Sequence, residues 1–411
     1  MRINFCFILV CFLLVFSPLA RAGVHLWAQT IVQTAVLAGL FVLTGTRIVR
    51  QHPLVKKNTL DAPLACIGLL VLAAAFRSDY PGLAAEGAVM FFTYTGVYYL
   101  AVNVITTRKA QRITVYTIAA TAVFISVIAV LKRFDMNPFL FWEYKDLAPN
   151  NFLTGTYGNR NHFAGWLEMA IPMVLCLLFT RNRTVRMKVF IIGVAVTLLI
   201  ILTFTFSRGG WIAAFSALIF MAVVSLGKRI YGKRFFIKTL LSLLAALILI
   251  LVSTPAFQRI APLVQANRSD HVALRLKVWD SSIALIKDHP LTGTGPGTFG
   301  QAFPLYNPAG FDVLPVTAHN DYLQFVAETG LLFVPLGVWL LHRFFCTGFI
   351  KLKSRSRQTR GITLGAMASV FALLVHTAFD FNLHIPANAI LFAVLCALVC
   401  AAPGTASGVP E

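Results

Sequence analysis

Six polar side chains of this sequence could together act on an anionic substrate. They are three arginines, two histidines and an aspartate: Arg160, Arg208, Arg275, His162, His319 and Asp380. Arginine keeps its charge and binds phosphate oxygens through two parallel hydrogen bonds. A neutral histidine is the usual general base near pH 7. The set therefore suits a reaction in which a lipid-linked diphosphate leaves while a hydroxyl group is deprotonated.

Arg160 and His162 lie at the entrance to a hydrophobic segment, within a stretch rich in glycine and asparagine (154–168). One interpretation is a binding site, because polar groups beside an apolar span are costly to place. The other is structural, since glycine and asparagine turn the chain and cap helices while arginine reaches lipid phosphates. Taken alone, the stretch leaves both interpretations open.

Arg208 lies in a tight turn between two hydrophobic segments and is followed by Gly209 and Gly210. It has no soluble loop to extend into, so it points either to lipid headgroups or between helices. Because glycine has no Cβ, we expect these glycines to let the backbone turn sharply and approach a partner closely.

His319 lies where a long polar segment becomes the next hydrophobic helix. The dipole of a helix N-terminus disfavours the protonated imidazole and so helps the ring to accept a proton. Asn320, Gln324 and Glu328 follow at a spacing of four, which predicts one polar helical face that runs toward the membrane.

The sequence contains no Asp-x-Asp motif and no carboxylate pair or histidine cluster suited to a metal. This disfavours a metal-dependent transferase and a two-carboxylate glycosidase, and we predict neither metal nor cofactor. The glycine-rich segment 293–300 lacks the strand–helix context of a nucleotide loop. Tight turns that present backbone N–H groups to an anion are the better interpretation.

The elements that must position these residues are membrane helices. Of the 411 residues 58% are hydrophobic and only 12% are charged, and apolar runs long enough to cross a bilayer recur along the chain. We predict an all-α polytopic membrane protein with about twelve spans, at 3–20, 24–46, 61–76, 85–105, 113–131, 163–180, 189–206, 210–226, 236–254, 321–342, 361–379 and 386–401.

A formal net charge of +20 could indicate nucleic-acid binding, but its distribution indicates membrane topology. Most lysines and arginines lie in every second connection between the predicted spans, as the positive-inside rule describes. Both termini are then cytoplasmic and the segment 254–320 lies on the outer side, with all six polar side chains. The cysteines lie in or beside apolar segments without metal-binding spacing, so we expect packing residues.

We divide the chain into residues 1–254 with nine spans, 255–320 as a large outer loop, and 321–411 with three spans and a short cytoplasmic tail. Residues 1–22 are either the first helix or a cleaved signal peptide. Within the loop, the spacing of apolar and polar residues predicts an amphipathic helix at 271–287. We expect it to end at Asp288–Pro290 and to lie near the membrane surface.

Five polar motifs stand out between residues 150 and 390. They are Thr156–Gly165 (TYGNRNHFAG), Ser207–Gly210 (SRGG), Asp288–Phe299 (DHPLTGTGPGTF), His319–Gly330 (HNDYLQFVAETG) and Asp380–Asn388 (DFNLHIPAN). Together they resemble the O-antigen ligase family, whereas the first 130 residues match it only as hydrophobic helices. The motifs do not separate ligases from related polysaccharide polymerases and protein O-oligosaccharyltransferases.

The resemblance implies a glycosyltransferase of the bacterial inner membrane, with its large loop and its active site facing the periplasm. It would move a glycan from an undecaprenyl-diphosphate carrier to lipid A–core or another acceptor, without a metal or a nucleotide sugar. The family's loop histidine falls on His319, which implies the base that activates the acceptor hydroxyl. Its two arginines fall on Arg208 and Arg275, which implies diphosphate recognition.

The remaining candidates, Arg160, His162, Asn320 and Asp380, are expected to bind substrate. A transporter is the rival from another class; it is disfavoured because the polar groups gather at one membrane boundary and no repeat is evident. The sequence does not indicate the transferred sugar, the acceptor or an oligomeric state.

Overall fold

The computed structural model describes residues 5–53, 57–134, 136, 152–180, 183–227, 268–307 and 315–401, with side chains from residue 274 onward in the helix that begins at Arg268. All regular structure in these ranges is helical, which confirms the predicted all-α class. A bundle contains α1 (Phe5–Leu19), α2 (Leu26–Val49), α3 (Asp61–Phe76), α4 (Pro81–Val104), α5 (Arg108–Arg133), α6 (Arg160–Thr180), α7 (Val185–Phe204), α8 (Arg208–Gly227), α14 (Phe333–Lys351), α15 (Arg357–His376) and α16 (Pro386–Cys400).

Eight helices of the bundle are long and apolar enough to cross a membrane. Three shorter apolar helices, α1, α3 and α16, correspond to three further predicted spans. The span predicted at 236–254 lies outside the described residues. The count of twelve spans therefore stays a prediction.

The span predicted at 321–342 is wrong as a single helix. The chain forms α13 (Asp321–Thr329), breaks at Gly330, and begins α14 at Phe333. Gly330 has a left-handed φ of 86°, and a Cβ there would overlap the Leu291 carbonyl group. The polar residues Gln324 and Glu328 consequently lie in a separate short helix, where they are buried, and not on a face that continues into the membrane.

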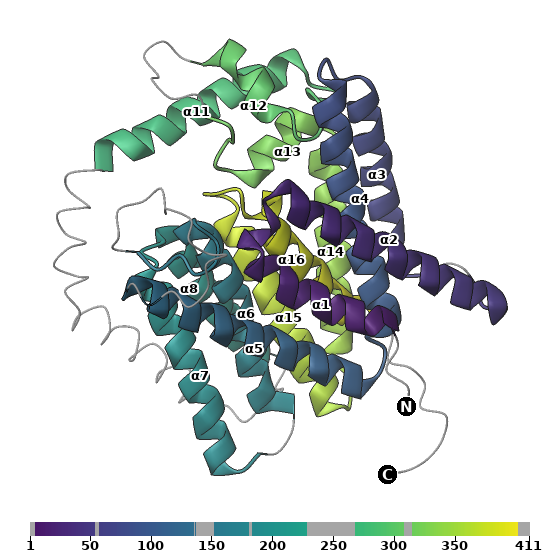
Figure 1. Cartoon of the computed structure of the whole chain (residues 1–411), viewed down its shortest axis with the longest axis vertical. Helices are drawn as coiled ribbons and strands as arrows, with labels where there is room; N and C mark the ends of the chain where they lie inside the picture. The colour runs from purple at the N-terminus through teal and green to yellow at the C-terminus, as the bar shows by residue number, and fades with distance from the viewer. Residues whose placement is uncertain are drawn as a thin grey trace.

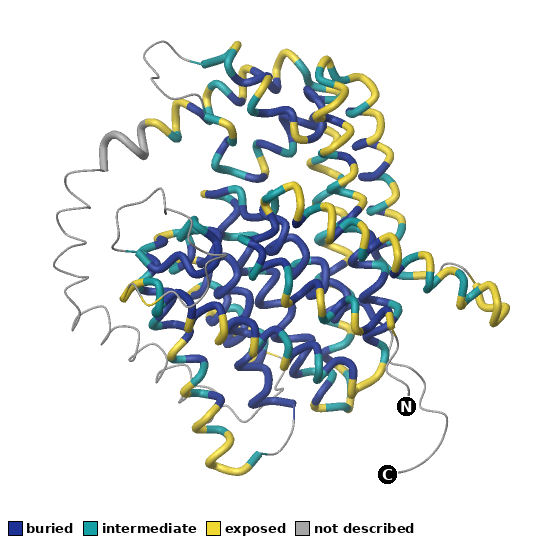
Figure 2. Tube along the Cα trace, in the orientation of Figure 1, coloured by how far each residue is buried: buried dark blue, intermediate teal, exposed yellow. Residues whose placement is uncertain are grey.

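The core of the bundle is centred on α6, of which every residue from His162 to Thr180 is buried (Figure 2). Helix α15 packs closely against it: Ser369 Oγ donates to the Met169 carbonyl, and Gly365 leaves room for Cys176. The outer helices α2, α7 and α14 expose apolar side chains, such as Phe41 and Phe190. Exposed apolar surface of this kind suits contact with lipid.

A smaller unit, α11 (Arg268–Asp288), α12 (Phe299–Ala302), the 3-10 helix η3 (Phe303–Tyr306) and α13, lies at the top of Figure 1. We call it the α11–α13 unit. Its own core contains Val278, Leu285, Phe299, Phe303 and Ala327. The predicted helix is confirmed as α11, and it ends at Asp288 as expected. Its amphipathic character is not confirmed, because Leu274 and Ile283 of the predicted apolar face are exposed. Its position on a membrane surface stays a prediction.

The glycine-rich segment 293–297 attaches this unit to the bundle. Ser78 Oγ, between α3 and α4, donates to the Thr294 carbonyl at 2.5 Å. Gly87 of α4 lies so close to Pro296 that a Cβ at residue 87 would overlap the Pro296 carbonyl oxygen. Glycine at position 87 therefore permits the close approach of loop and helix.

Candidate active site

Three helix ends bring the predicted site residues to one end of the bundle. Arg160 is the first residue of α6 and Arg208 is the first residue of α8, while Asp380 lies in the turn after α15. The N-terminus of α13 meets this turn, because the Asp321 N–H donates to the carbonyls of Thr377 (2.9 Å) and Asp380 (3.2 Å). His319, two residues earlier, is thereby brought against the bundle.

Asp380 lies between two imidazoles. Its Oδ1 is 3.5 Å from His319 Nδ1 and 3.9 Å from His162 Nε2, and its side chain is 2% exposed. Phe381 packs edge-on against both rings. Burial alone would raise the pKa of the Asp380 carboxyl, but the facing histidines outweigh it and hold that pKa well below its ordinary value. Asp380 is therefore a carboxylate whose charge attracts both imidazoles, while neither facing nitrogen is hydrogen-bonded in this structure.

His319 adopts a left-handed backbone conformation with a φ of 49°. Its neighbours fix this conformation. The Ala318 N–H donates to Gln324 Oε1 at 3.1 Å, and the Ala318 carbonyl accepts a hydrogen bond from Trp279 Nε1 at 3.0 Å. Such conformations cost about 1–3 kcal/mol and are retained where surrounding contacts determine them, often at functional sites.

Asn320 is the N-cap of α13. Its side-chain oxygen accepts hydrogen bonds from the N–H groups of Tyr322 (3.0 Å) and Leu323 (3.2 Å). This satisfies two of the free donors at the start of the helix. The side chain thus helps to set the direction of α13 after His319, and its contact with substrate stays a prediction.

The three arginines form one cationic cluster. The charges of Arg208 and Arg275 both act on Arg160, and so does the Asp380 carboxylate. The Arg160 guanidinium lies 4.1 Å from the centre of the Phe152 ring, which holds it in place. Neither α6 nor α8 has an acidic residue in its first turn. The positive ends of both helix dipoles therefore add to the cluster.

The turn before Arg208 differs from the expectation. The left-handed residue is Phe206 (φ 54°), and Gly209 and Gly210 are already helical. The turn is held by side chains instead, since Thr205 Oγ1 accepts from the Ser207 N–H and Ser207 Oγ accepts from the Gly210 N–H. The expected close approach is confirmed, because a Cβ at Gly210 would lie 2.7 Å from Ala164 Cβ.

The glycine-rich segment 293–298 forms tight turns as predicted, with positive φ at Gly293, Gly295 and Gly297. Its N–H groups are not free for a bound anion, so that part of the interpretation is wrong. Those of Gly293, Thr294, Gly295 and Thr298 donate to backbone carbonyls, and Pro296 has none. The Gly297 N–H donates to Glu328 Oε2 at 2.8 Å. The segment docks against α13 with every donor already used.

Residues 193–333 match the family model described as O-Antigen ligase. This part of the chain is therefore similar to the O-antigen ligase family, as the motifs predicted. The matched region contains Arg208, Arg275 and His319, and it extends from α7 to the start of α14. No curated protein matches the chain. The match, together with the apolar helices, indicates a bacterial membrane glycan transferase of the ligase and polymerase type.

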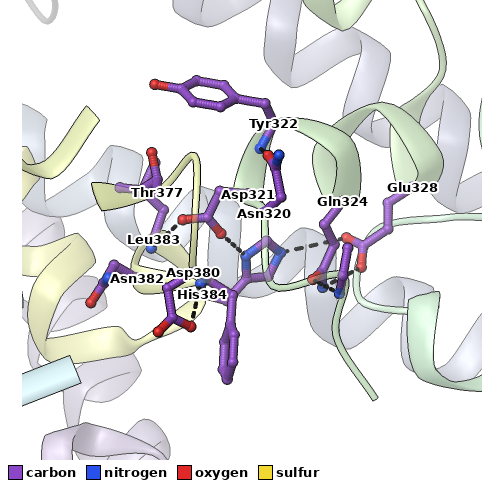
Figure 3. Close-up of polar contacts among 12 residues, drawn as sticks. Asn320, Asp321, Tyr322, Gln324, Glu328, Thr377, Asp380, Asn382, Leu383 and His384 are labelled. Atoms are coloured by element: carbon purple, nitrogen blue, oxygen red, sulfur yellow. Dashed lines mark hydrogen bonds and ion pairs between the residues drawn. The ribbon is translucent and has the colours of Figure 1, made fainter. Parts of the chain in front are cut away.

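We did not predict His384 as part of the site, although it lies beside Asp321 and Glu328 (Figure 3). Its Nδ1 is 2.5 Å from Asp321 Oδ1 and its Nε2 is 3.8 Å from Glu328 Oε2. Phe325 stacks on the ring at a centroid distance of 4.8 Å. Burial alone would lower the pKa of His384, but both carboxylates outweigh it and raise that pKa to about 10.

We call Asp321, Glu328 and His384 the carboxylate clasp. It joins α13 to the turn that carries Asp380, because Asp321 Oδ2 also accepts from the Leu383 N–H at 2.8 Å. The clasp therefore fixes the segment of His319 relative to Asp380. The signal for it in the sequence was the pair of carboxylates in one short polar helix.

A second pair that we did not predict lies deeper in the bundle. His376 Nδ1 is 2.8 Å from Glu168 Oε2, and both side chains are almost completely buried. Glu168 is the only acidic residue of α6, and a carboxylate inside an apolar span was the signal that could have identified it. Within the described parts of the chain, no group of three His, Cys, Asp or Glu side chains could hold a metal ion.

Proposed function

We propose that this protein transfers a glycan from undecaprenyl diphosphate to an acceptor hydroxyl at the periplasmic face of the bacterial inner membrane. Ligation of O-antigen to lipid A–core is the reaction that we favour. The observation that carries the proposal is the position of His319, whose imidazole lies 3.5 Å from the buried Asp380 carboxylate. The charge of Asp380 also acts on Arg160, as do those of Arg208 and Arg275.

His319 would act as the general base. Because its Nδ1 faces Asp380, the tautomer with a proton on Nδ1 leaves Nε2 free to accept one. Asp380 would hold this tautomer and stabilise the imidazolium that forms. Nε2 would take the proton of the acceptor hydroxyl while the hydroxyl oxygen attacks the sugar carbon that is linked to the diphosphate.

The arginines would stabilise the leaving group. As the new glycosidic bond forms, the bond between the sugar carbon and the diphosphate oxygen breaks, and the diphosphate leaves with the electron pair. Arg208 and Arg275 would bind its oxygens, with Arg160 beside them. Because guanidinium groups supply this positive charge, we propose that the reaction needs neither a divalent metal nor a nucleotide sugar.

The test is a reconstituted transfer assay. Purified protein receives an undecaprenyl-diphosphate glycan with or without lipid A–core, in the presence of a chelator. We expect glycan on lipid A–core with the wild type, and a rate about 10² to 10⁴ lower with His319→Ala, which is the usual cost of losing a general base. His342→Ala, at an exposed position of α14, is the matched control and should keep the wild-type rate.

Each other outcome has a defined meaning. Normal turnover by His319→Ala would contradict its assignment as the base. A ladder of longer carrier-linked glycan would identify a polymerase that uses the same donor site. A protein acceptor in place of lipid A–core would identify an O-oligosaccharyltransferase. Activity only after addition of a divalent metal would contradict the role given to the arginines.

A further inference from the structure

The buried pair Glu168–His376 has no part in the steps above. The side chain of Glu168 is 0% exposed and that of His376 is 1% exposed. Among the described residues, Glu168 Oε1 has no hydrogen-bond partner. A buried ion pair costs desolvation energy and can often be replaced by apolar residues without loss of stability. The pair is therefore poorly explained as a device for stability alone.

The pair touches the three helices that begin at Arg160, begin at Arg208 and lead into the turn of Asp380. Glu168 lies on α6, which begins with Arg160, and His376 ends α15, which leads into the turn of Asp380. The other edge of the His376 ring faces Gly209 of α8. A Cβ at Gly209 would lie 2.6 Å from His376 Cδ2 and 2.7 Å from Nε2. The ring thus occupies the space of a side chain directly after Arg208.

The attachment of α6 to α15 does not depend on this pair. Ser369 already joins the two helices through the Met169 carbonyl, and Gly361 and Gly365 permit close packing farther along α15. What the pair adds is a contact to the first turn of α8. The hydrogen bond that Glu168 Oε2 accepts from His376 Nδ1 fixes the orientation of the imidazole, and the imidazole in turn limits where Gly209 can lie.

We infer that Glu168 and His376 are positioning residues that set the place of Arg208 for binding the donor diphosphate. This inference rests on the proposed function of Arg208. Displacement of a binding group by about 1 Å can cost up to about a hundredfold in rate. Loss of the pair should therefore weaken use of the donor while use of the acceptor is unchanged.

The decisive experiment compares Gly209→Ala, His376→Ala and the double variant in the transfer assay, with donor and acceptor varied separately. We expect Gly209→Ala to raise the KM for the donor by about tenfold or more, since its Cβ would push against the ring. In the His376→Ala background the added methyl group has room, so Gly209→Ala should cause no further change. Gly193→Ala, in α7 with open space around it, should leave both KM values unchanged.

A second comparison tests the hydrogen bond. Glu168→Gln keeps an oxygen that can accept from Nδ1–H, so its KM for the donor should stay within about threefold of wild type. Glu168→Leu removes the acceptor and should behave like His376→Ala. Equal changes in the KM for the donor with Glu168→Gln and Glu168→Leu would overturn the inference. Additive effects of Gly209→Ala and His376→Ala on that KM would also overturn it. So would a change in the KM for the acceptor alone.

The Arg208→Lys variant separates this inference from the proposed function. If Arg208→Lys leaves the KM for the donor unchanged, the role proposed for Arg208 fails, and the inference fails with it. If Arg208→Lys raises that KM but none of the Glu168, Gly209 and His376 variants does, only the positioning role is wrong. Unfolding midpoints in detergent show that each variant is folded before its kinetics are compared.

Discussion

At the residue scale, we expect that a positive charge alone is not sufficient for the function of Arg208. Arg208→Lys keeps the positive charge but loses the planar fork that binds two phosphate oxygens at once. Hydrogen bonds to charged groups contribute about 1.5–3 kcal/mol, so we predict that kcat/KM for the donor falls by about tenfold to a hundredfold. Steady-state kinetics across donor concentrations measure this. Arg343→Lys, on exposed α14, is the control, and an unchanged Arg208→Lys variant would favour contact with lipid headgroups.

His384 gives the fold a dependence on pH. Its pKa of about 10 in the folded protein lies above the ordinary value of 6.5, so the folded state binds the proton more tightly. The stabilisation is fully present below pH 6.5 and is lost as the pH rises toward 10. We predict that the midpoint of thermal unfolding in detergent decreases across this range in the wild type.

His384→Gln should remove this dependence on pH. It should also destabilise the protein near neutral pH by about 3–5 kcal/mol, because two buried carboxylates lose their cation. His342→Gln, at an exposed histidine of α14, should follow the wild-type curve. A His384→Gln curve that is parallel to the wild-type curve would mean that another group causes the dependence on pH.

Residue type alone predicted part of the candidate site, and distance along the chain explains what it could not predict. An arginine can indicate phosphate binding and a histidine can indicate proton transfer from the residue type alone. Arg208, Arg275 and His319 were therefore predicted individually. The partners of His384 and Glu168 are 63 and 208 residues away along the chain. A local pattern cannot pair residues across such distances, so these partners appeared only in the fold.

At the element scale, the attachment of the α11–α13 unit to α4 should depend on one glycine. Gly87→Ala places a methyl group against the carbonyl of Pro296, so the glycine-rich segment must move away from α4. We predict lower transfer activity, because the unit carries His319, and faster hydrogen exchange in residues 293–298. Gly82→Ala lies on the same helix in open space and should be neutral, or stabilising by up to about 1 kcal/mol. Equal behaviour of the two variants would show that this contact does not hold the unit.

Helices were predictable from their apolar periodicity, but their ends were not. The run 321–342 is apolar enough to suggest one span. It is divided at Gly330, where the backbone lies against the Leu291 carbonyl group. The glycines after Arg208 suggested a turn, whereas Thr205, Ser207 and Phe206 make it. In both cases tertiary contacts determine what a glycine does, and its position in the sequence does not distinguish a turn from close packing.

At the scale of the whole molecule, the alternation of basic connections has a counterpart in the fold. Segments on the basic side meet one another: Gln358 Nε2 donates to the Arg108 carbonyl, and Arg343 Nε donates to the Thr59 carbonyl. The site lies where α6 and α8 begin and α15 ends, which are the opposite ends of their helices. The fold is thus consistent with a site on the side that has fewer basic connections.

We predict that this site side faces the periplasm. Leu291 is 73% exposed in the α11–α13 unit, and His52 is exposed in the basic connection after α2. In a Cys346→Ser background, a membrane-impermeant thiol reagent added to intact spheroplasts should label Leu291→Cys at once. It should label His52→Cys only after the membrane is permeabilised, because lysine and arginine are retained on the cytoplasmic side. The reverse labelling would put the arginine cluster in the cytoplasm and exclude a periplasmic acceptor such as lipid A–core, whatever the chemistry at His319.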